Sequence, residues 1–142
     1  MLPLEGIRVV DLTRMLVGPT ATMLLADMGA EVIKIEPNAG DDTRYQQLRY
    51  APEACPFFLA LNRNKRDIVL DLAVAAGREV LLRLVAEADV VVHNFRPGVV
   101  EKLAITYDDL RKVRANVIYC SISAFGETGP YAKRPGTDVL FQ

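Results

Sequence analysis

The feature that most constrains the fold is a pair of β-branched runs with a helix-forming stretch between them, near the start of the chain. Residues 7–12 and 31–36 have the composition of short strands. Between them, Gly18-Pro19 suits a helix start, and apolar residues at 21, 24, 25 and 28 recur at helical spacing. A strand, a short helix and a second strand in immediate succession predict a parallel pair joined by a right-handed crossover.

Runs of the same two kinds continue along the chain. The further predicted elements are strands at 67–72, 89–94 and 116–123, a helix at 75–88 and a helical turn at 57–61. Thr106 and Asp109 have the spacing of a capping box, which predicts a short helix running to about Val113. This alternation predicts an α/β fold, a Rossmann-like open and mostly parallel sheet with flanking helices.

Composition excludes several classes of partner. The chain is 51% hydrophobic and 25% charged, as in globular domains, and its net charge of −1 gives no overall attraction to nucleic acid or to an anionic membrane. No apolar run approaches the ~20 residues of a membrane span, and the N-terminus has no signal-peptide pattern. Cys55 and Cys120 make no disulfide framework, and no residues have metal-ligand spacing. We therefore expect a cytoplasmic protein without a metal.

Polar residues gather where the predicted strands end. In open α/β sheets, ligands bind beyond the carboxyl ends of the strands. The charged residues of those segments are Arg14, Arg44, Arg96, Lys102, Lys133 and Arg134, together with Asp41, Asp42, Glu127 and Asp138. Such a set suits an anionic ligand that carries phosphates, which Arg and Lys bind through charge-assisted hydrogen bonds. A solvated surface of mixed charge is the alternative.

Three narrower patterns bear on the ligand. The glycine-rich dinucleotide motif is absent, since only Gly18 lies in the first turn, and this disfavours NAD. Asn94 and Phe95 end a strand and precede a Pro-Gly turn, where they could hydrogen-bond and stack an adenine, or could simply form a structural turn. His93 is the one histidine, and at the end of a strand it is more often a structural residue than a general base.

Several ordered phrases together resemble class III CoA-transferases, the formyl-CoA and carnitine CoA-transferase family. The phrases are residues 3–13, Gly18-Pro19, 25–36, 62–66, 88–98 and 125–130. They extend over essentially the whole chain.

The resemblance implies an interlocked homodimer of subunits, each with a large Rossmann-like domain built from both chain ends and a small domain between them. Residues 1–142 would be the N-terminal part of the large, CoA-binding domain. The positions that match CoA contacts are Leu16, Val17, Pro37, Asn38, Leu70, Asp71, Leu72, Ala73, Asn94, Phe95, Arg96, Lys102, Leu103, Arg134 and Thr137. The family's nucleophilic aspartate lies beyond Asp138, so Asp138 is expected only to support catalysis, or to cap the next helix.

The implied activity is transfer of CoA between an acyl-CoA thioester and a small carboxylic acid through an aspartyl anhydride. Leu16 replaces a glutamine of formyl-CoA transferases, which argues against formate or oxalate as substrates. Thr137 stands where 2-methylacyl-CoA racemases carry a catalytic histidine, which argues against a racemase. A racemase-like enzyme and a non-catalytic CoA-binding or dimerisation fragment remain the alternatives.

The chain ends inside an apolar element. Residues 138–142, Asp-Val-Leu-Phe-Gln, resemble a sequence cut by picornaviral 3C proteases. We expect a truncated domain without transferase activity, with apolar surface exposed where the sheet would continue.

Overall fold

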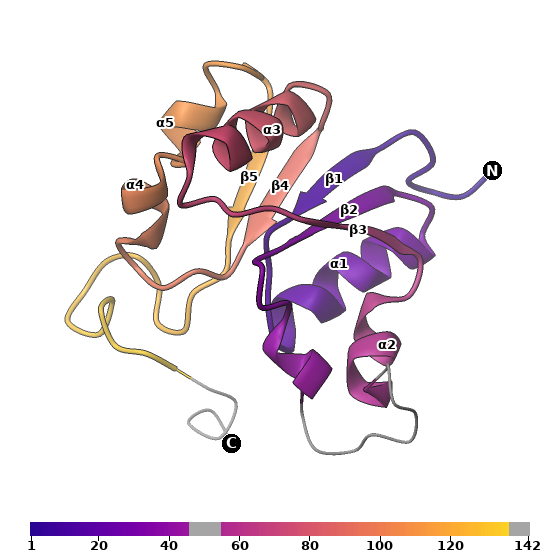
Figure 1. Cartoon of the computed structure of the whole chain (residues 1–142), viewed down its shortest axis with the longest axis horizontal. Helices are drawn as coiled ribbons and strands as arrows, with labels where there is room; N and C mark the ends of the chain where they lie inside the picture. Colours follow the sequence, from indigo (N-terminus) through magenta and orange to yellow (C-terminus); the bar gives the residue numbers. More distant parts are fainter. Residues whose placement is uncertain (46–54, 137–142) are drawn as a thin grey trace.

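The computed structural model describes residues 1–45 and 55–136, and these residues contain one sheet of five parallel strands. The strands are β1 (Arg8–Asp11), β2 (Glu31–Glu36), β3 (Lys65–Val69), β4 (Val90–His93) and β5 (Ile118–Ser121), in the spatial order β3-β2-β1-β4-β5 (Figure 1). This confirms the predicted Rossmann-like α/β fold, with every strand pair parallel.

Helices cover both faces of the sheet. They are α1 (Val17–Asp27), α2 (Pro56–Asn62), α3 (Ala75–Ala86), α4 (Val99–Leu103) and α5 (Tyr107–Leu110), with a 3-10 turn η1 (Asp42–Tyr45). One core cluster joins α1 to the strands through Ala26 and Val9, and the other joins α3 and α5 to the opposite face. Val9 and Val10 are both fully buried on opposite faces, as expected in a sheet covered on both sides.

Several element boundaries differ from the sequence-based prediction, and the differences at β3 and α4 bear on the site. Strand β3 covers Lys65–Val69, where 67–72 was predicted. It begins earlier because the Lys65 ammonium is buried in an ion pair and so lies within the sheet. Helix α4 was not predicted. It has five residues and begins after Gly98 and ends before Ala104, both in the left-handed region. The predicted capping box is confirmed: Thr106 accepts from the Asp109 backbone N–H, and the Asp109 carboxylate accepts in return.

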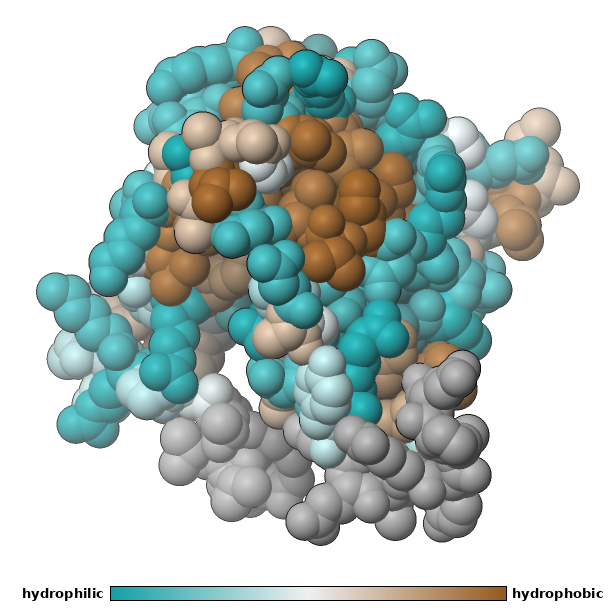
Figure 2. Space-filling view, viewed as in Figure 1, coloured by the Kyte–Doolittle hydropathy of each residue, from teal (hydrophilic) through white to brown (hydrophobic). Residues whose placement is uncertain are grey.

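A hydrophobic patch is exposed beside α3, on the sheet face that this helix covers (Figure 2). The partly buried strand and strand-end residues of that face include Ile33, Ile68, Leu70 and Leu72. The described residues include no helix long and apolar enough to cross a membrane.

Candidate functional site

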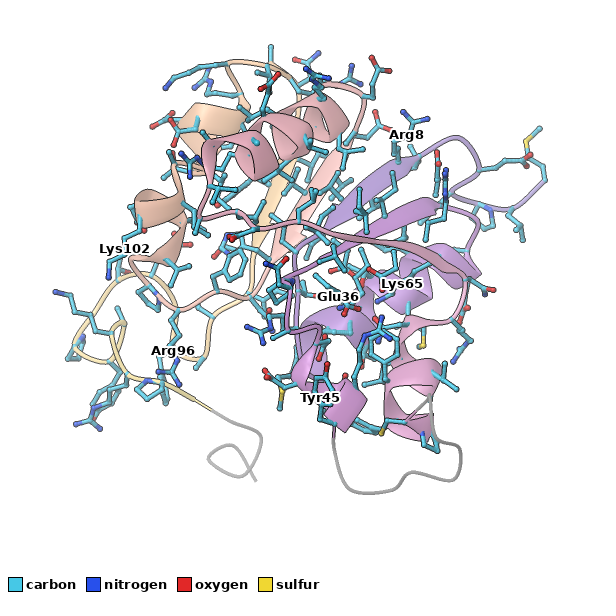
Figure 3. The ribbon with its side chains drawn as sticks, in the orientation of Figure 1. Arg8, Glu36, Tyr45, Lys65, Arg96 and Lys102 are labelled. Atoms are coloured by element: carbon cyan, nitrogen blue, oxygen red, sulfur yellow. The ribbon has the colours of Figure 1, made fainter. Side chains whose placement is uncertain are left out.

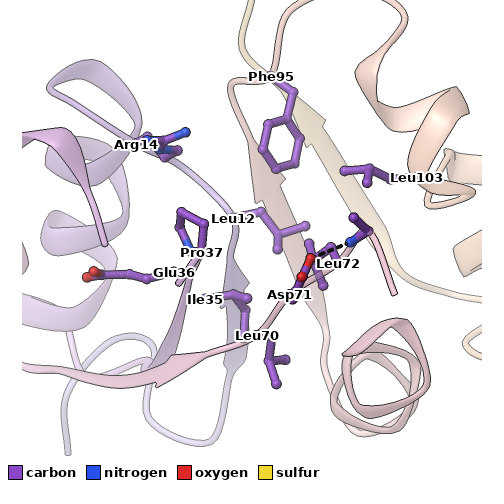
Figure 4. Close-up of a pocket in the computed structure, with 11 residues that line it drawn as sticks. Leu12, Arg14, Ile35, Glu36, Pro37, Leu70, Asp71, Leu72, Phe95 and Leu103 are labelled. Carbon is purple, nitrogen blue, oxygen red and sulfur yellow. Dashed lines mark hydrogen bonds between the residues drawn. The ribbon is translucent and has the colours of Figure 1, made fainter. Parts of the chain in front are cut away.

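An apolar pocket of about 190 Å3 lies beyond the carboxyl ends of β1, β2 and β3 (Figure 4). Its walls are formed by Leu12, Arg14, Ile35, Glu36, Pro37, Leu70, Asp71, Leu72, Ala73, Phe95 and Leu103. The Glu36 carboxylate points away from the apolar walls in Figure 4 and is held by Arg44 outside them. An apolar pocket of this kind suits a flat ring more than a phosphate group.

The topology of the sheet creates this pocket. Strand β1 lies between β2 and β4, so the connections that leave β1 and β4 run to opposite halves of the sheet. Ligands of open α/β sheets bind at such a switch point, where the strand-end loops separate. Leu12 follows β1, Pro37 follows β2 and Phe95 lies just beyond β4, so each strand supplies a wall at one edge.

The wall formed by residues 70–73 is fixed by local hydrogen bonds. The Asp71 carboxylate accepts from the Ala73 backbone N–H at 2.9 Å. From helix α3, the Arg78 guanidinium donates to the carbonyl oxygens of Leu72 and Ala73 at 3.1 and 2.9 Å. Gly77 of the same helix approaches the Asp71 carbonyl so closely that a Cβ there would lie 2.0 Å from the oxygen. The helix therefore sets the position of this wall.

Two buried ion pairs support the loop that follows β1. The Lys34 ammonium donates to the Asp41 carboxylate at 2.9 Å, and the side chains are 1% and 0% exposed. The Lys65 ammonium lies 3.1 Å from the Asp11 carboxylate and also donates to Thr22 and to the Pro19 carbonyl. Each buried charge thus has a partner of opposite sign, which a buried charge requires.

The pKa values of this cluster follow from burial and its partners. Burial alone would raise the pKa of Asp41, but hydrogen bonds from Thr43 and the charge of Lys34 outweigh it and hold that pKa below its ordinary value. Burial lowers the pKa of Lys65, and the Asp11 carboxylate opposes that change. These pairs lie beneath the loop, and none of their four side chains lines the pocket.

Glu36 and Asp67 share one arginine at the edge of the pocket. The Arg44 guanidinium donates to both oxygens of Glu36, at 2.7 and 2.9 Å, and to Asp67 at 2.6 Å, and it stacks on Phe58. Burial and the adjacent Glu36 carboxylate raise the pKa of Asp67 to about 6. For Glu36, burial would raise the pKa, but the bonds from Arg44 and from the Asp41 backbone lower it. Asp67 therefore takes up a proton as the pH falls through about 6, while Glu36 stays ionised.

Asp67→Asn is expected to flatten the pH dependence of stability. A carboxyl group whose folded pKa is raised contributes stability that is complete below its unfolded pKa of about 4 and is lost as the pH rises through about 6. The free energy of unfolding of the variant should equal that of wild type at pH 4 and exceed it by on the order of 1 kcal/mol at pH 8. The difference is small because the side chain is about a third exposed and solvent screens its charge. Urea unfolding between pH 4 and 8 measures this.

The matched control for that experiment is Asp108→Asn, on an 84% exposed side chain. The difference in the free energy of unfolding between this variant and wild type should not change with pH. If the difference in the free energy of unfolding between wild type and Asp67→Asn is also constant with pH, the raised pKa of Asp67 is contradicted.

The structure brings together seven of the residues predicted to contact CoA. In the pocket are Pro37, Leu70, Asp71, Leu72, Ala73, Phe95 and Leu103. Outside its walls are Leu16, Val17, Asn38, Asn94, Arg96, Lys102 and Arg134, while Thr137 and Asp138 are outside the described residues. Figure 3 places Arg96 and Lys102 well apart from Glu36, near α4. Their proposed contacts with phosphates stay a prediction.

The sequence-based list of ligand contacts omitted Leu12, Arg14, Ile35 and Glu36. Leu12, Ile35 and Glu36 end strands or directly follow them, so the rule that ligands bind at strand ends could have found them. Arg14 was among the strand-end cations but was not assigned a contact.

A second cavity of about 350 Å3 lies on the other side of Phe95, between β4, β5 and α4. His93 lines it, and its Nδ1 accepts from the Phe95 backbone N–H at 3.3 Å. Burial lowers the pKa of His93, and its Nε2 has no hydrogen-bond partner among the described residues. The expectation that this histidine is structural stays a prediction, and His93 is not part of the first pocket's walls.

Comparisons with known proteins agree on one family. The family described as CoA-transferase family III matches residues 4–142. The succinyl-CoA:glutarate CoA-transferase of Mus musculus is 45% identical over 141 residues, which are 99% of this chain and 32% of that protein. The acetyl-CoA:oxalate CoA-transferase of Acetobacter aceti is 44% identical over 141 residues, 99% of this chain and 36% of that protein.

A solved structure gives the same result for the fold. The orthorhombic form of Rv3272 from M. tuberculosis is 42% identical and has a TM-score of 0.90 to this chain, covering 98% of this chain and 39% of that one. The chain therefore spans about a third of the length of the curated relatives named above.

Proposed function

This chain belongs to CoA-transferase family III, and from that premise we propose that it is the CoA-binding part of an enzyme that moves CoA between an acyl-CoA thioester and a small carboxylic acid. Relatives named for glutarate and oxalate suggest a small dicarboxylate as the acid. The observation that carries the proposal is that Pro37, residues 70–73, Phe95 and Leu103 meet in one apolar pocket at the switch point of the sheet. These are positions that the family resemblance assigns to CoA.

In this proposal the pocket takes the adenine ring. Phe95 and Leu103 offer apolar contact on one side, and Leu70 and Leu72 on the other (Figure 4). Base stacking on an aromatic side chain contributes about 1–3 kcal/mol. The phosphates would then lie outside the apolar walls, where Arg14, Arg96 and Lys102 are the candidate cations.

The chemistry proposed for the complete enzyme is covalent catalysis by an aspartate. Its carboxylate attacks the thioester carbonyl, forming a mixed anhydride and releasing CoA thiolate. The thiolate then attacks the aspartyl carbonyl of this anhydride, which releases the donor acid and leaves CoA as a thioester on the enzyme. The acceptor carboxylate attacks that thioester, forming a second anhydride and releasing the thiolate again, and the thiolate attacks the acceptor's carbonyl to form the new thioester and free the aspartate. We place the nucleophile beyond residue 142, with Asp138 as a supporting residue, so residues 1–142 bind CoA without turning it over. We also propose that the complete enzyme is a cytoplasmic homodimer and that this chain is the N-terminal part of its large domain.

Phe95→Ala is expected to weaken CoA binding by about tenfold or more, because it removes one wall of the adenine pocket. Titration calorimetry of the purified chain with CoA measures the dissociation constant. The probe 3′,5′-ADP, which lacks the pantetheine arm, should lose affinity by the same factor.

The control variant is Phe57→Ala, on α2 at the opposite face, where the side chain is 40% exposed. It should bind CoA as wild type does. Failure of the wild-type chain to bind CoA at all would refute the proposed function, and equal binding by both phenylalanine variants would refute the placement of adenine.

A further inference from the structure

The loop between β1 and α1 is held almost entirely by side chains from other parts of the chain. The Thr13 N–H donates to Asp11 at 2.9 Å, and the Thr13 carbonyl accepts from the Lys34 ammonium at 2.9 Å. The Met15 N–H donates to Asp41 at 3.2 Å. The backbone groups of Thr13 and Met15 thus bond to side chains in place of the backbone of a neighbouring strand.

Asn94 makes the two hydrogen bonds in the middle of this loop. Its Oδ1 accepts from the Arg14 backbone N–H at 2.8 Å, and its Nδ2 donates to the Arg14 carbonyl at 2.8 Å. The backbone ladder between β1 and β4 ends with the bond from the Leu12 N–H to the Val92 carbonyl. A carboxamide that offers one acceptor and one donor continues the ladder by two more bonds, as a further strand residue would.

Two features of the loop show why the hydrogen bonds from Asn94 matter for the pocket. Met15 has a φ of 69°, a left-handed conformation that costs a residue with a side chain about 1–3 kcal/mol and persists where surrounding contacts impose it. Arg14 lines the apolar pocket, and its guanidinium is paired with Asp42 at 2.9 Å. The position of the Arg14 backbone therefore decides where this wall and its cation lie.

We propose that Asn94 is a positioning residue, which acts on CoA binding through the backbone of Arg14 and not by contact with adenine. This inference rests on the proposed function, since it concerns the same pocket. Both ends of the amide are already engaged with Arg14, and Asn94 is not part of the pocket wall.

The test is Asn94→Asp, with CoA affinity measured by calorimetry at pH 5 and at pH 8. An ionised aspartate keeps the acceptor for the Arg14 N–H but places a negative oxygen against the Arg14 carbonyl. A protonated aspartate can donate again. We expect the dissociation constant to rise about tenfold over wild type at pH 8 and by a smaller factor at pH 5, because the Arg14 carbonyl beside the carboxylate favours its protonated form. At each pH the dissociation constant of the variant is divided by that of wild type, so that effects of pH on CoA or on Asp67, which both proteins share, cancel. Asn116→Asp, at an exposed site, should keep a ratio near one.

A double-mutant cycle with Arg14→Ala separates positioning from direct contact. If Asn94 acts through Arg14, its substitution should weaken CoA binding much less when Arg14 is already alanine. If Asn94 contacts adenine directly, the two losses should add in full, and this result would overturn the proposal. Should Asn94→Asp unfold at pH 8, Asn94→Ser serves in the same cycle with the same two outcomes. A wild-type chain that does not bind CoA would refute the proposed function, whereas wild-type binding with an unaffected Asn94→Asp would refute only this inference.

Discussion

Lys34→Met is expected to lower the free energy of unfolding by about 3–5 kcal/mol at neutral pH, because it leaves the Asp41 carboxylate buried without its cation. The methionine fills most of the volume of the lysine stem, so the loss is mainly electrostatic. The same change removes the donor to the Thr13 carbonyl and so loosens the loop that carries Arg14.

Urea unfolding at pH 7 gives the magnitude of the loss, and its pH dependence and one further variant identify its cause. In the wild type, the lowered pKa of Asp41 means that its stabilisation is present above the unfolded pKa and is lost as the pH falls through the folded value. In Lys34→Met the unpaired carboxylate should instead favour protonation, so the deficit should shrink in acid. The double variant Lys34→Met with Asp41→Asn should recover part of the loss.

The control is Arg83→Met, which breaks the exposed pair with Glu79 on α3. It should cost less than about 0.5 kcal/mol, as exposed helix pairs do. A loss below 1 kcal/mol in Lys34→Met would show that the buried pair contributes little beyond its own desolvation.

The same lysines show why part of the fold could be predicted and part could not. The boundaries of β2 were predicted correctly, because its apolar residues carry the signal despite Lys34 in the middle. Strand β3 was predicted two residues late, because Lys65 and Arg66 resemble a basic turn when the partner Asp11 is not known. A charge can be buried only beside its counter-charge, and that pairing is a property of the folded sheet.

For the candidate site, the strand-end rule and the family resemblance located most of the walls. Residues 70–73 and Phe95 were predicted, and they meet in the pocket. The hydrogen bonds from the Asn94 side chain to the Arg14 backbone were not predicted. In the sequence, an asparagine at a strand end looks the same whether its amide faces a ligand or a neighbouring loop. The bonds to Arg14 depend on β1 and β4 being neighbours, which local sequence does not state.

Gly77→Ala is the other substitution for which we expect a large effect, and its sign is opposite to the one that helix propensity gives. Alanine in place of glycine within a helix is usually more stable by up to about 1 kcal/mol. At Gly77, the added Cβ would lie 2.0 Å from the Asp71 carbonyl oxygen and 2.7 Å from its carbon. Both are backbone atoms, so the helix or the 70–73 wall has to move. Overpacking of this kind typically costs about 1–3 kcal/mol.

Urea unfolding and CoA titration of Gly77→Ala should therefore both show losses, since the displaced wall is the one that carries Leu70 and Leu72 into the pocket. The matched control is Ala76→Gly, at the exposed neighbouring position of α3, which should lose about 1 kcal/mol from propensity alone and leave CoA affinity unchanged. Alanine would then be the better residue at position 76 and the worse one at 77. A Gly77→Ala variant as stable as wild type would mean that the 70–73 segment yields easily, and α3 could then not be what fixes this wall of the proposed adenine pocket.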